Sequence, residues 1–306
     1  MGALRVLVIG GTGFIGRTIV ETLLGRGHEP TLFNRGRNAV FPGVEQRLGD
    51  REAGDYASLR TGEWDAVVDV IGYLPAEVRP TMDVLGDGDR VGRYLFISSH
   101  AVFDGAGPGL RPAIPDARPP LTNATYGPSK VACEQDIVAR FGERATIVRP
   151  VKVAGPHDSQ DGLTYWVRRA ARGGRVALPA DPAQPVQLVD ARDLARLVVD
   201  LLAAGRGGAF TAAGPTQSFA ELIATCAAVA GTEVTVTPVP ARRFPLVKPP
   251  ELWETQRRRA APEMTVTPLP VTVRDVLEWD RSRGEPPMEG GFTEAEEQAA
   301  VRLVSR

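Results

Sequence analysis

The feature that most constrains the fold of this chain is a string of glycines close to its N-terminus. Residues 10–16 read Gly-Gly-Thr-Gly-Phe-Ile-Gly. A short apolar run, 4–9, precedes them, and apolar residues at helical spacing follow from Phe14 to Leu24. This pattern predicts a buried strand, a tight turn and a helix. Glycines permit such a turn and a close approach of the backbone, so the N–H groups that begin the helix can bind a phosphate group.

Alternating strand and helix signals continue through the first half of the chain. The further strands predicted there are 30–33, 44–48, 66–71, 94–98 and 145–148. A helix is predicted from about 125 to 140. Repeated alternation of this kind predicts an α/β fold, a doubly wound parallel sheet of the Rossmann type. Near the other end of the chain, Thr293 with Glu296 is typical of a capping box that begins a last helix.

The second half has a different character, because glycine and proline become frequent after Pro150. We predict that 186–189 returns to the sheet as a strand and that 191–202 forms a helix. The proline- and arginine-rich segment 242–270 favours a loop-rich cap over a second regular core. The predicted domains are therefore a dinucleotide-binding domain, 1–154 with 186–212, and a smaller substrate-binding domain, 155–185 with 213–306.

Composition excludes several classes of partner. The chain has 306 residues, with 36 Lys and Arg against 37 Asp and Glu, a net charge of −1. Because no excess of positive charge attracts phosphate backbones, we expect a small-molecule substrate and no nucleic acid. Two cysteines cannot build a disulfide framework and lack metal-ligand spacing, so no metal is expected. With no apolar stretch of about 20 residues and no cleavable leader, we expect a cytoplasmic protein that binds no membrane.

The end of the second predicted strand bears on the choice of dinucleotide. An enzyme that binds NAD usually places Asp or Glu there to hold the ribose 2′-hydroxyl. Here Asn34 is followed by Arg35 and, two positions on, by Arg37, with no carboxylate. A guanidinium forms charge-assisted hydrogen bonds with a 2′-phosphate, which favours NADP(H) over NAD(H). Alternatively, both arginines only solvate a loop.

Other residues near the predicted strand ends complete the expected cofactor site. Asp50 follows the third strand, where it would meet the adenine edge, although the aspartate of a plain turn has the same signature. The full set of predicted cofactor contacts is Gly10, Gly13, Phe14, Ile15, Gly16, Asn34, Arg35, Asp50, Arg51, Gly72, Ser98, Tyr126, Lys130 and Pro150.

Tyr126 and Lys130 are the residues that most directly suggest a reaction. A separation of four places them on one face of the predicted helix, about one turn apart. An ammonium favours the phenolate of a neighbouring tyrosine, whose ordinary pKa is about 10, and so makes proton transfer accessible. Only Lys130, Lys152 and Lys248 interrupt a strong preference for arginine. A lysine at this position suggests a need for a compact positive charge that can also bind a ribose. Alternatively, Tyr126 and Lys130 are only a solvated pair on the helix surface.

Two serines mark the end of the strand predicted at 94–98. Ser98 and Ser99 lie at the edge of the sheet where open α/β folds bind their ligands. The Ser99 hydroxyl would hydrogen-bond a carbonyl or alcohol oxygen while Tyr126 transfers its proton. A pair of serines that caps the following turn is the alternative interpretation.

Taken in order, these segments resemble the extended short-chain dehydrogenase/reductases, also called the NAD-dependent epimerase/dehydratase family. The resemblance implies a Rossmann domain, a smaller C-terminal substrate domain and a homodimer. It also implies that Ser99 orients the substrate oxygen and that Tyr126 is the acid/base. Lys130 would then hold the nicotinamide ribose, and Pro150 would border the nicotinamide. The shared motifs are the glycine string, Ser-x-x-Val-Phe from Ser99 to Phe103, Tyr126-x-x-x-Lys130 and Arg149-Pro150.

Departures from the family pattern affect the expected reaction. Dehydratases of the family usually carry an Asp-Glu pair after the catalytic serine or threonine, whereas this chain has His100 and Ala101. Because neither residue supplies the acid and base for water elimination, dehydration is disfavoured. The strand-two carboxylate common in NAD-retaining epimerases is also missing, and 102–105 looks more like the segment of some sugar-nucleotide reductases.

We therefore expect an NADP-dependent oxidoreductase that reduces a carbonyl to an alcohol, or the reverse, on a small polar or ring-containing metabolite. The predicted substrate contacts are His100, His157, Asp158 and Trp166, although turn or core positions suit each of them. An epimerase that oxidises and re-reduces a sugar-nucleotide-like substrate with tightly held cofactor is the first alternative. A non-catalytic dinucleotide sensor or an RNA-binding relative is the second.

Overall fold

The computed structural model describes residues 2–37, 41–86, 90–105, 107–240, 257–288 and 290–304. Of the segment predicted to be rich in loops, 242–270, the part from 242 to 256 lies outside the described residues. The chain divides into two units. Unit 1 comprises Met1–Val151, Arg192–Ala212 and Ala260–Thr265, and unit 2 comprises Lys152–Ala191, Ala213–Arg259 and Val266–Arg306.

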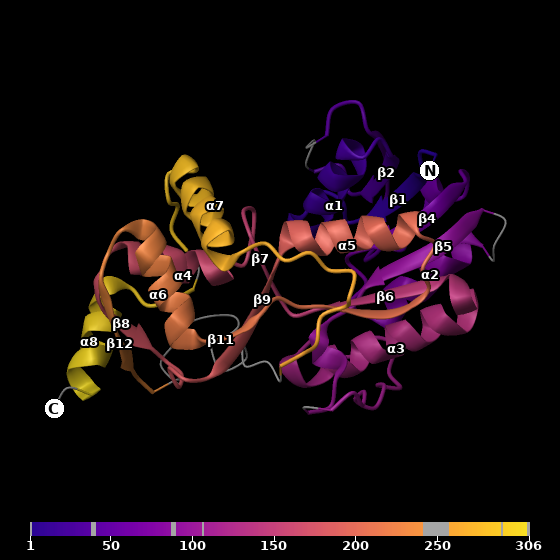
Figure 1. Cartoon of the computed structure of the whole chain (residues 1–306). Helices are drawn as coiled ribbons and strands as arrows, with labels where there is room; N and C mark the ends of the chain where they lie inside the picture. Colours follow the sequence, from indigo (N-terminus) through magenta and orange to yellow (C-terminus); the bar gives the residue numbers. More distant parts are fainter. Residues whose placement is uncertain are drawn as a thin grey trace. The chain divides into compact units, whose positions relative to one another are not determined.

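A seven-stranded parallel sheet forms the centre of unit 1, and it confirms the fold class that the alternating sequence predicts (Figure 1). The strand order is β3-β2-β1-β4-β5-β6-β10. The order reverses between β1 and β4, and open α/β sheets bind their ligands beyond the carboxyl ends of the strands at such a point. The strands are β1 (Arg5–Ile9), β2 (Glu29–Asn34), β3 (Glu45–Leu48), β4 (Trp64–Asp69), β5 (Val91–Ile97), β6 (Ala145–Pro150) and β10 (Gly208–Ala212).

Helices cover both faces of this sheet (Figure 1). On one face, Arg26, which follows α1, donates to Asp200 of α5 at 2.5 Å. On the other face, Arg79 of α2 donates to Asp136 of α3 at 2.8 Å. The central strands are buried on both sides, which explains their nearly continuous apolar sequences. The helices are α1 (Phe14–Gly25), α2 (Pro75–Leu85), α3 (Asn123–Phe141) and α5 (Ala191–Ala203), with short 3₁₀ turns η1 (Ala57–Leu59), η2 (His100–Val102) and η3 (Gly142–Arg144).

Unit 2 has a regular core of its own, so the expectation of a loop-rich cap without one is wrong. Its buried apolar side chains come mainly from four helices and from β8, and its partner strand β12 packs partly buried valines against them. A three-stranded sheet has the order β11-β9-β7. The elements are β7 (Lys152–Ala154), α4 (Gly162–Ala171), β8 (Gly174–Leu178), β9 (Pro185–Asp190), β11 (Thr216–Ser218), α6 (Phe219–Ala230), β12 (Val234–Pro238), α7 (Leu269–Ser282) and α8 (Glu294–Val304).

The predicted strand 186–189 exists, but its predicted partner is wrong. Strand β9 pairs with β7 and β11, whereas the last strand of the large sheet is β10, which pairs with β6. The apolar pattern of β9 identifies a buried strand without identifying the sheet that buries it. Both β7 and β9 therefore lie in unit 2, although the predicted boundaries assign them to the dinucleotide-binding domain. A later segment joins unit 1, where Ala261 N donates to the carbonyl of Thr211 at 2.9 Å.

The capping box predicted for the last helix is confirmed. Glu296 accepts from the backbone N–H and the hydroxyl of Thr293, at 2.9 and 2.8 Å, and Glu296 N donates to Thr293 Oγ1 at 3.3 Å. Across the residues that the structure describes, none of the helices is both long and apolar enough to cross a membrane.

Candidate active site

The glycine turn follows the carboxyl end of β1, and a different structural reason accounts for glycine at each of three positions. Gly10 has φ 87°, a conformation that L side chains rarely adopt. A Cβ at Gly16 would lie 2.1 Å from the carbonyl oxygen of Gly10, so only glycine lets α1 pack on the turn. A Cβ at Gly13 would meet nothing nearer than 4.0 Å, and Gly13 precedes α1 without a side-chain cap. The first N–H groups of α1 therefore suit a pyrophosphate, and the turn fits a dinucleotide.

The residues predicted to meet the adenosine side lie at the ends of neighbouring strands. Asn34 ends β2, and its side-chain oxygen accepts the backbone N–H two residues on at 2.6 Å. Arg35 and Arg37 are exposed, and their side chains form no hydrogen bond or ion pair with another described residue. Their guanidinium groups are therefore available to an anion. Asp50 accepts the backbone N–H two residues on at 2.9 Å, as the aspartate of a plain turn does.

The side chain of Arg51 is buried, which argues against its predicted contact with the cofactor. Its guanidinium donates to both carboxylate oxygens of Asp69, at 2.9 and 2.6 Å, and to Thr81. Burial by itself raises the pKa of Asp69, but the charge and hydrogen bonds of Arg51 outweigh it and hold that pKa below its ordinary value. Tyr94 donates to the same carboxylate at 2.7 Å, and Ile71 N does so at 3.2 Å. This buried pair anchors the segment that leaves β4.

Ser99 and Tyr126 meet beyond the carboxyl end of β5. The Ser99 hydroxyl accepts the backbone N–H of Ala101 at 3.2 Å, as the capping interpretation predicts, and it lies close enough to Tyr126 to act on the pKa of the phenol. Burial raises the pKa of Tyr126 to about 12, although the nearby Ser99 hydroxyl acts in the opposite direction. The phenol therefore keeps its proton at neutral pH, and it is suited to donating that proton to an oxygen that gains negative charge.

Lys130 lies one helical turn beyond Tyr126 and is only 1% exposed. Its Nζ donates to the carbonyl oxygens of Gly72 and Ile97, both at 2.8 Å. Burial lowers the pKa of Lys130 to about 8. The prediction that this ammonium brings the Tyr126 pKa below its ordinary value is wrong for this structure. Burial dominates at the phenol, and Lys130 is engaged by backbone carbonyls instead.

Tyr73, which the sequence analysis does not identify, contacts both of these residues. Its ring centroid lies 6.5 Å from that of Tyr126 and 5.3 Å from Lys130 Nζ. Tyr73 follows Gly72 in the segment that leaves β4, so it lies at the same edge of the sheet as Ser99. An aromatic residue placed just after a predicted parallel strand is the signal that could have identified it.

Ser98, predicted to contact the cofactor, directs its hydroxyl toward α3 instead. It donates to Glu134 Oε1 at 2.5 Å. Arg149 of β6 donates to both oxygens of the same carboxylate, at 3.0 and 2.6 Å. The network joins β5, α3 and β6 and fixes the strand end that carries the next serine. Sequence reasoning missed Glu134, although it continues the spacing of four from Tyr126 through Lys130.

The other predicted cofactor contacts lie on neighbouring elements of the same unit. Phe14 and Ile15 are half-buried in the first turn of α1, and Pro150 is buried at the end of β6. Gly72 packs so closely that a Cβ would lie 2.8 Å from Val78. Among the described residues, no group of three or more His, Cys, Asp or Glu side chains could hold a metal ion.

The predicted substrate contacts are divided between the two units. His100 is half-buried at the start of η2 in unit 1. His157 and Asp158 belong to unit 2. His157 is exposed with φ 71°, and its ring centroid lies 5.4 Å from that of Trp279. Asp158 is 4% exposed and accepts the backbone N–H two residues on at 3.0 Å. That contact is typical of a turn, the alternative that the sequence allows.

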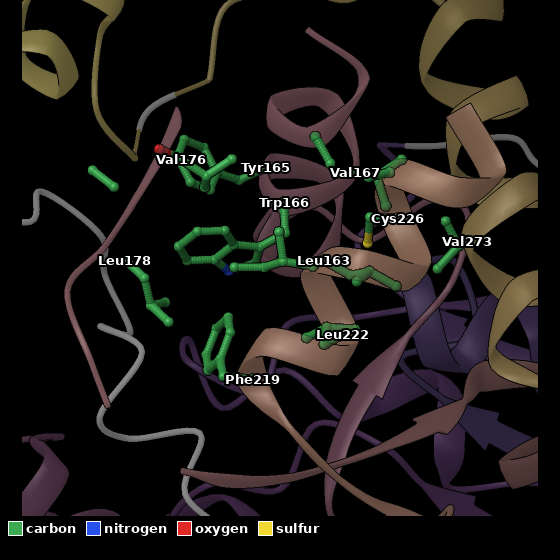
Figure 2. Packing of buried hydrophobic residues seen from close by; sticks show 14 of the residues in the cluster. Leu163, Tyr165, Trp166, Val167, Val176, Leu178, Phe219, Leu222, Cys226 and Val273 are labelled. Carbon is green, nitrogen blue, oxygen red and sulfur yellow. The ribbon is translucent and has the colours of Figure 1, made fainter. Parts of the chain in front are cut away.

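Trp166 is a core residue, so the prediction that it contacts the substrate is wrong. Its side chain is completely buried in α4. Figure 2 shows the indole between the rings of Tyr165 and Phe219, whose centroids lie 4.9 and 5.0 Å away in edge-on arrangements. Its helical spacing alone does not distinguish a pocket wall from a core, and here α4 packs that face against α6.

Comparison with known proteins identifies the group to which this arrangement belongs. The sequence model of the NAD dependent epimerase/dehydratase family matches residues 6–71 and 82–213. These segments contain the glycine turn, Ser99, Tyr126 and Lys130. The chain belongs to the NAD dependent epimerase/dehydratase family.

Curated relatives of this family member include a reductase and a stem-loop binding protein. The 2′-dehydrokanamycin reductase of Streptomyces kanamyceticus is 32% identical over 218 residues, which are 66% of this chain and 59% of the relative. The chloroplast stem-loop binding protein of 41 kDa b of Arabidopsis thaliana is 26% identical over 216 residues, 65% of this chain and 55% of the relative. The matches thus span between 55% and 59% of the length of these two relatives.

Solved structures share the fold over a larger part of the chain. The Bordetella bronchiseptica enzyme WbmF, in complex with NAD+ and UDP, matches with a TM-score of 0.71 at 16% identity, over 99% of this chain and 97% of that one. The UDP-glucose 4-epimerase of Thermus thermophilus, in complex with NAD, matches with a TM-score of 0.67 at 20% identity, over 90% and 99%. At these identities the likeness establishes the fold alone.

Proposed function

We propose that this family member is an NADP-preferring oxidoreductase that reduces a carbonyl to an alcohol on a small polar or ring-containing metabolite. The observation that carries the proposal is that Ser99 lies close enough to Tyr126 to act on the pKa of its phenol, beside the buried Lys130. All three lie in unit 1 with the glycine turn, and Ser99 follows the carboxyl end of β5 as the turn follows that of β1. Open α/β sheets bind their ligands at this edge.

The side chains divide the chemistry among them. A bound nicotinamide dinucleotide supplies the hydride. The backbone of the turn at Gly13 binds the pyrophosphate, and Lys130 binds hydroxyl groups of the ribose. The Ser99 hydroxyl donates a hydrogen bond to the carbonyl oxygen, and Tyr126 donates its proton to that oxygen as negative charge develops. The raised pKa of Tyr126, about 12, supports the role of acid because the phenol holds a proton to give.

Two further observations support the choice of cofactor and reaction. The exposed guanidinium groups of Arg35 and Arg37, with no carboxylate at the end of β2, favour a 2′-phosphate. One relative named above is a reductase. The other is named for stem-loop binding, but the net charge of −1 gives this chain no general electrostatic attraction for phosphate backbones.

Replacement of Tyr126 by Phe tests the proposal. We expect wild-type protein to oxidise NADPH in the presence of at least one member of a panel of cyclic ketones and keto sugars. Y126F should lose at least about 100-fold in kcat, the usual effect of losing a positioned acid. Its affinity for NADPH, measured by fluorescence titration, should change little because the phenol does not hold the phosphates. Unchanged turnover in Y126F would refute the role of Tyr126, and stereochemical inversion without net consumption of NADPH would indicate an epimerase.

A further inference from the structure

The ammonium of Lys130 is enclosed on several sides by groups of unit 1. Two carbonyl oxygens, those of Gly72 and Ile97, accept its hydrogen bonds at 2.8 Å. Two aromatic rings face it as well, with centroids 4.3 Å (Phe96) and 5.3 Å (Tyr73) from Nζ. A cation so placed is stabilised by the negative faces of the rings. A ligand hydroxyl can therefore reach Nζ only after one of these groups moves.

Three of the four enclosing groups are fixed by the core. Ile97 and Phe96 belong to β5 and are 3% and 0% exposed. Gly72 has no side chain to move, and its backbone packs against Phe96 and Val78. Tyr73 differs, because it is 40% exposed. Only this ring has solvent beside it into which it can rotate.

The backbone of Tyr73 is fixed by hydrogen bonds, whereas its ring is partly exposed to solvent. Glu77, in the first turn of α2, accepts the N–H groups of Tyr73 and Leu74, at 2.8 and 3.1 Å. The buried pair of Asp69 and Arg51 anchors the same segment from its other end. A change of side-chain rotamer is therefore sufficient to uncover Lys130, with no movement of the segment.

We propose that the Tyr73 ring is a gate on Lys130, which must rotate off the ammonium before a hydroxyl group of the bound ligand can reach it. That this ligand is the dinucleotide rests on the proposed function. The gate acts through the ring and its cation–π contact with Lys130, so the Tyr73 hydroxyl is dispensable. Tyr73 is thus a positioning residue for the ligand rather than a donor of protons.

Chemical labelling of Lys130 tests the gate without any substrate. The chain contains only Lys130, Lys152 and Lys248, so acetylation of each can be followed separately by peptide mass spectrometry. Measured as a function of pH, the rate of Lys130 acetylation rises to a plateau. The pH at half of the plateau rate gives the pKa of Lys130, and the height of the plateau reports how readily the reagent reaches its amine. Besides Tyr73, the titratable or charged groups that act on Lys130 are Cys133, Asp69, Glu134 and Arg51, and none of them is altered in the variants.

Three substitutions separate the ring from the hydroxyl and from general damage. In Y73A the plateau should rise about tenfold, the size of a lost cation–π contact. The midpoint should move up from about 8 toward 10.5, because hydration of the uncovered ammonium outweighs the loss of the contact with the ring. Y73F should match wild type in both quantities. Leu121→Ala, which removes an exposed apolar side chain elsewhere in unit 1, should also match wild type.

The outcomes distinguish the gate from the proposed function. Equal profiles for Y73A and wild type would overturn the gate, as would a Y73F profile like that of Y73A. Lys152 in unit 2 serves as the internal reference, and a rise at Lys152 as large as that at Lys130 would show general loosening and overturn the gate too. In stopped-flow mixing, NADPH should associate faster with Y73A than with wild type. If the labelling changes occur but the protein binds no NADPH, the gate hypothesis stands, and the hypothesis that its ligand is the dinucleotide is refuted.

Discussion

At the scale of single residues, Arg35 offers the sharpest test of cofactor choice. Its exposed guanidinium follows β2 where NAD enzymes of this fold place a carboxylate. We expect wild-type protein to bind NADPH more tightly than NADH. Arg35→Asp should reverse this order, because a carboxylate repels the 2′-phosphate and accepts from the 2′-hydroxyl. Fluorescence titration with both cofactors measures the change, which we expect to exceed about tenfold for a charged hydrogen bond.

Arg60→Asp is the matched control, because Arg60 is another exposed arginine of unit 1 and the substitution changes the net charge equally. It should leave the preference between NADPH and NADH unchanged. If R35D and R60D affect NADPH equally, the effect is one of overall charge and the assignment of Arg35 is wrong.

Local spacing explains which residues of the candidate site could be predicted. The glycine turn and the pairing of Tyr126 with Lys130 are set within a few positions along the chain, so their patterns are visible in the sequence. The contacts of Tyr73 and Arg51 depend on residues far away, since Arg51 meets Asp69 and Tyr73 meets Lys130 only after the sheet has formed. Burial likewise decides that the Tyr126 pKa rises, and no motif reports burial.

At the scale of elements, the start of α3 links helix stability to the candidate site. Thr122 caps this helix, and its Oγ1 accepts the N–H of Thr125 at 3.2 Å. Tyr126 lies in the first turn behind that cap. Thr122→Ala should therefore lower the free energy of unfolding by about 1 kcal/mol, the usual effect of losing a cap, and also lower kcat severalfold because the first turn frays. Urea unfolding and NADPH oxidation measure the two effects.

Two variants serve as controls for that cap. Thr122→Ser retains the hydroxyl and should behave as wild type. Thr293→Ala removes the equivalent cap of α8, which carries no candidate site residue, so stability should fall by a similar amount without a loss of kcat. If kcat falls as far in T293A as in T122A, the loss of kcat in T122A results from lower stability alone, and the predicted link between this cap and Tyr126 is wrong.

At this scale, the sequence correctly predicts which segments are strands, but not always the strands with which they pair. The six strands predicted in the first half all occur in the large sheet, because alternation with helices implies parallel neighbours. The strand at 186–189 gave no such context, and it joined β7 and β11 instead. The core of unit 2 was not predicted for a related reason, since its apolar residues are spread over helices far apart in the sequence.

At the scale of the whole molecule, cofactor binding should connect segments that are distant in the chain. The turn at 10–16, the segment at 70–74 and the strand end at 97–99 all lie at the carboxyl edge of one sheet. We expect NADPH to slow hydrogen exchange in all three, because a ligand that binds only the folded state stabilises the backbone it contacts. The opposite edge of the same sheet, at 28–30 and 62–64, is the internal control and should not change. Protection that omits 10–16 would contradict the assigned pyrophosphate site.

The chain passes several times between its two units, which has a consequence for protein engineering and for evolution. It leaves unit 1 after Val151, returns at Arg192, leaves again after Ala212 and comes back once more for Ala260–Thr265. A single cut in the gene therefore yields neither unit intact, and a fragment that stops at Val151 lacks the strand that covers the edge of β6. Exchange of unit 2 between relatives therefore requires several coordinated crossovers. Unit 2 is thus expected to diversify by point substitution and loop insertion rather than by exchange as a block.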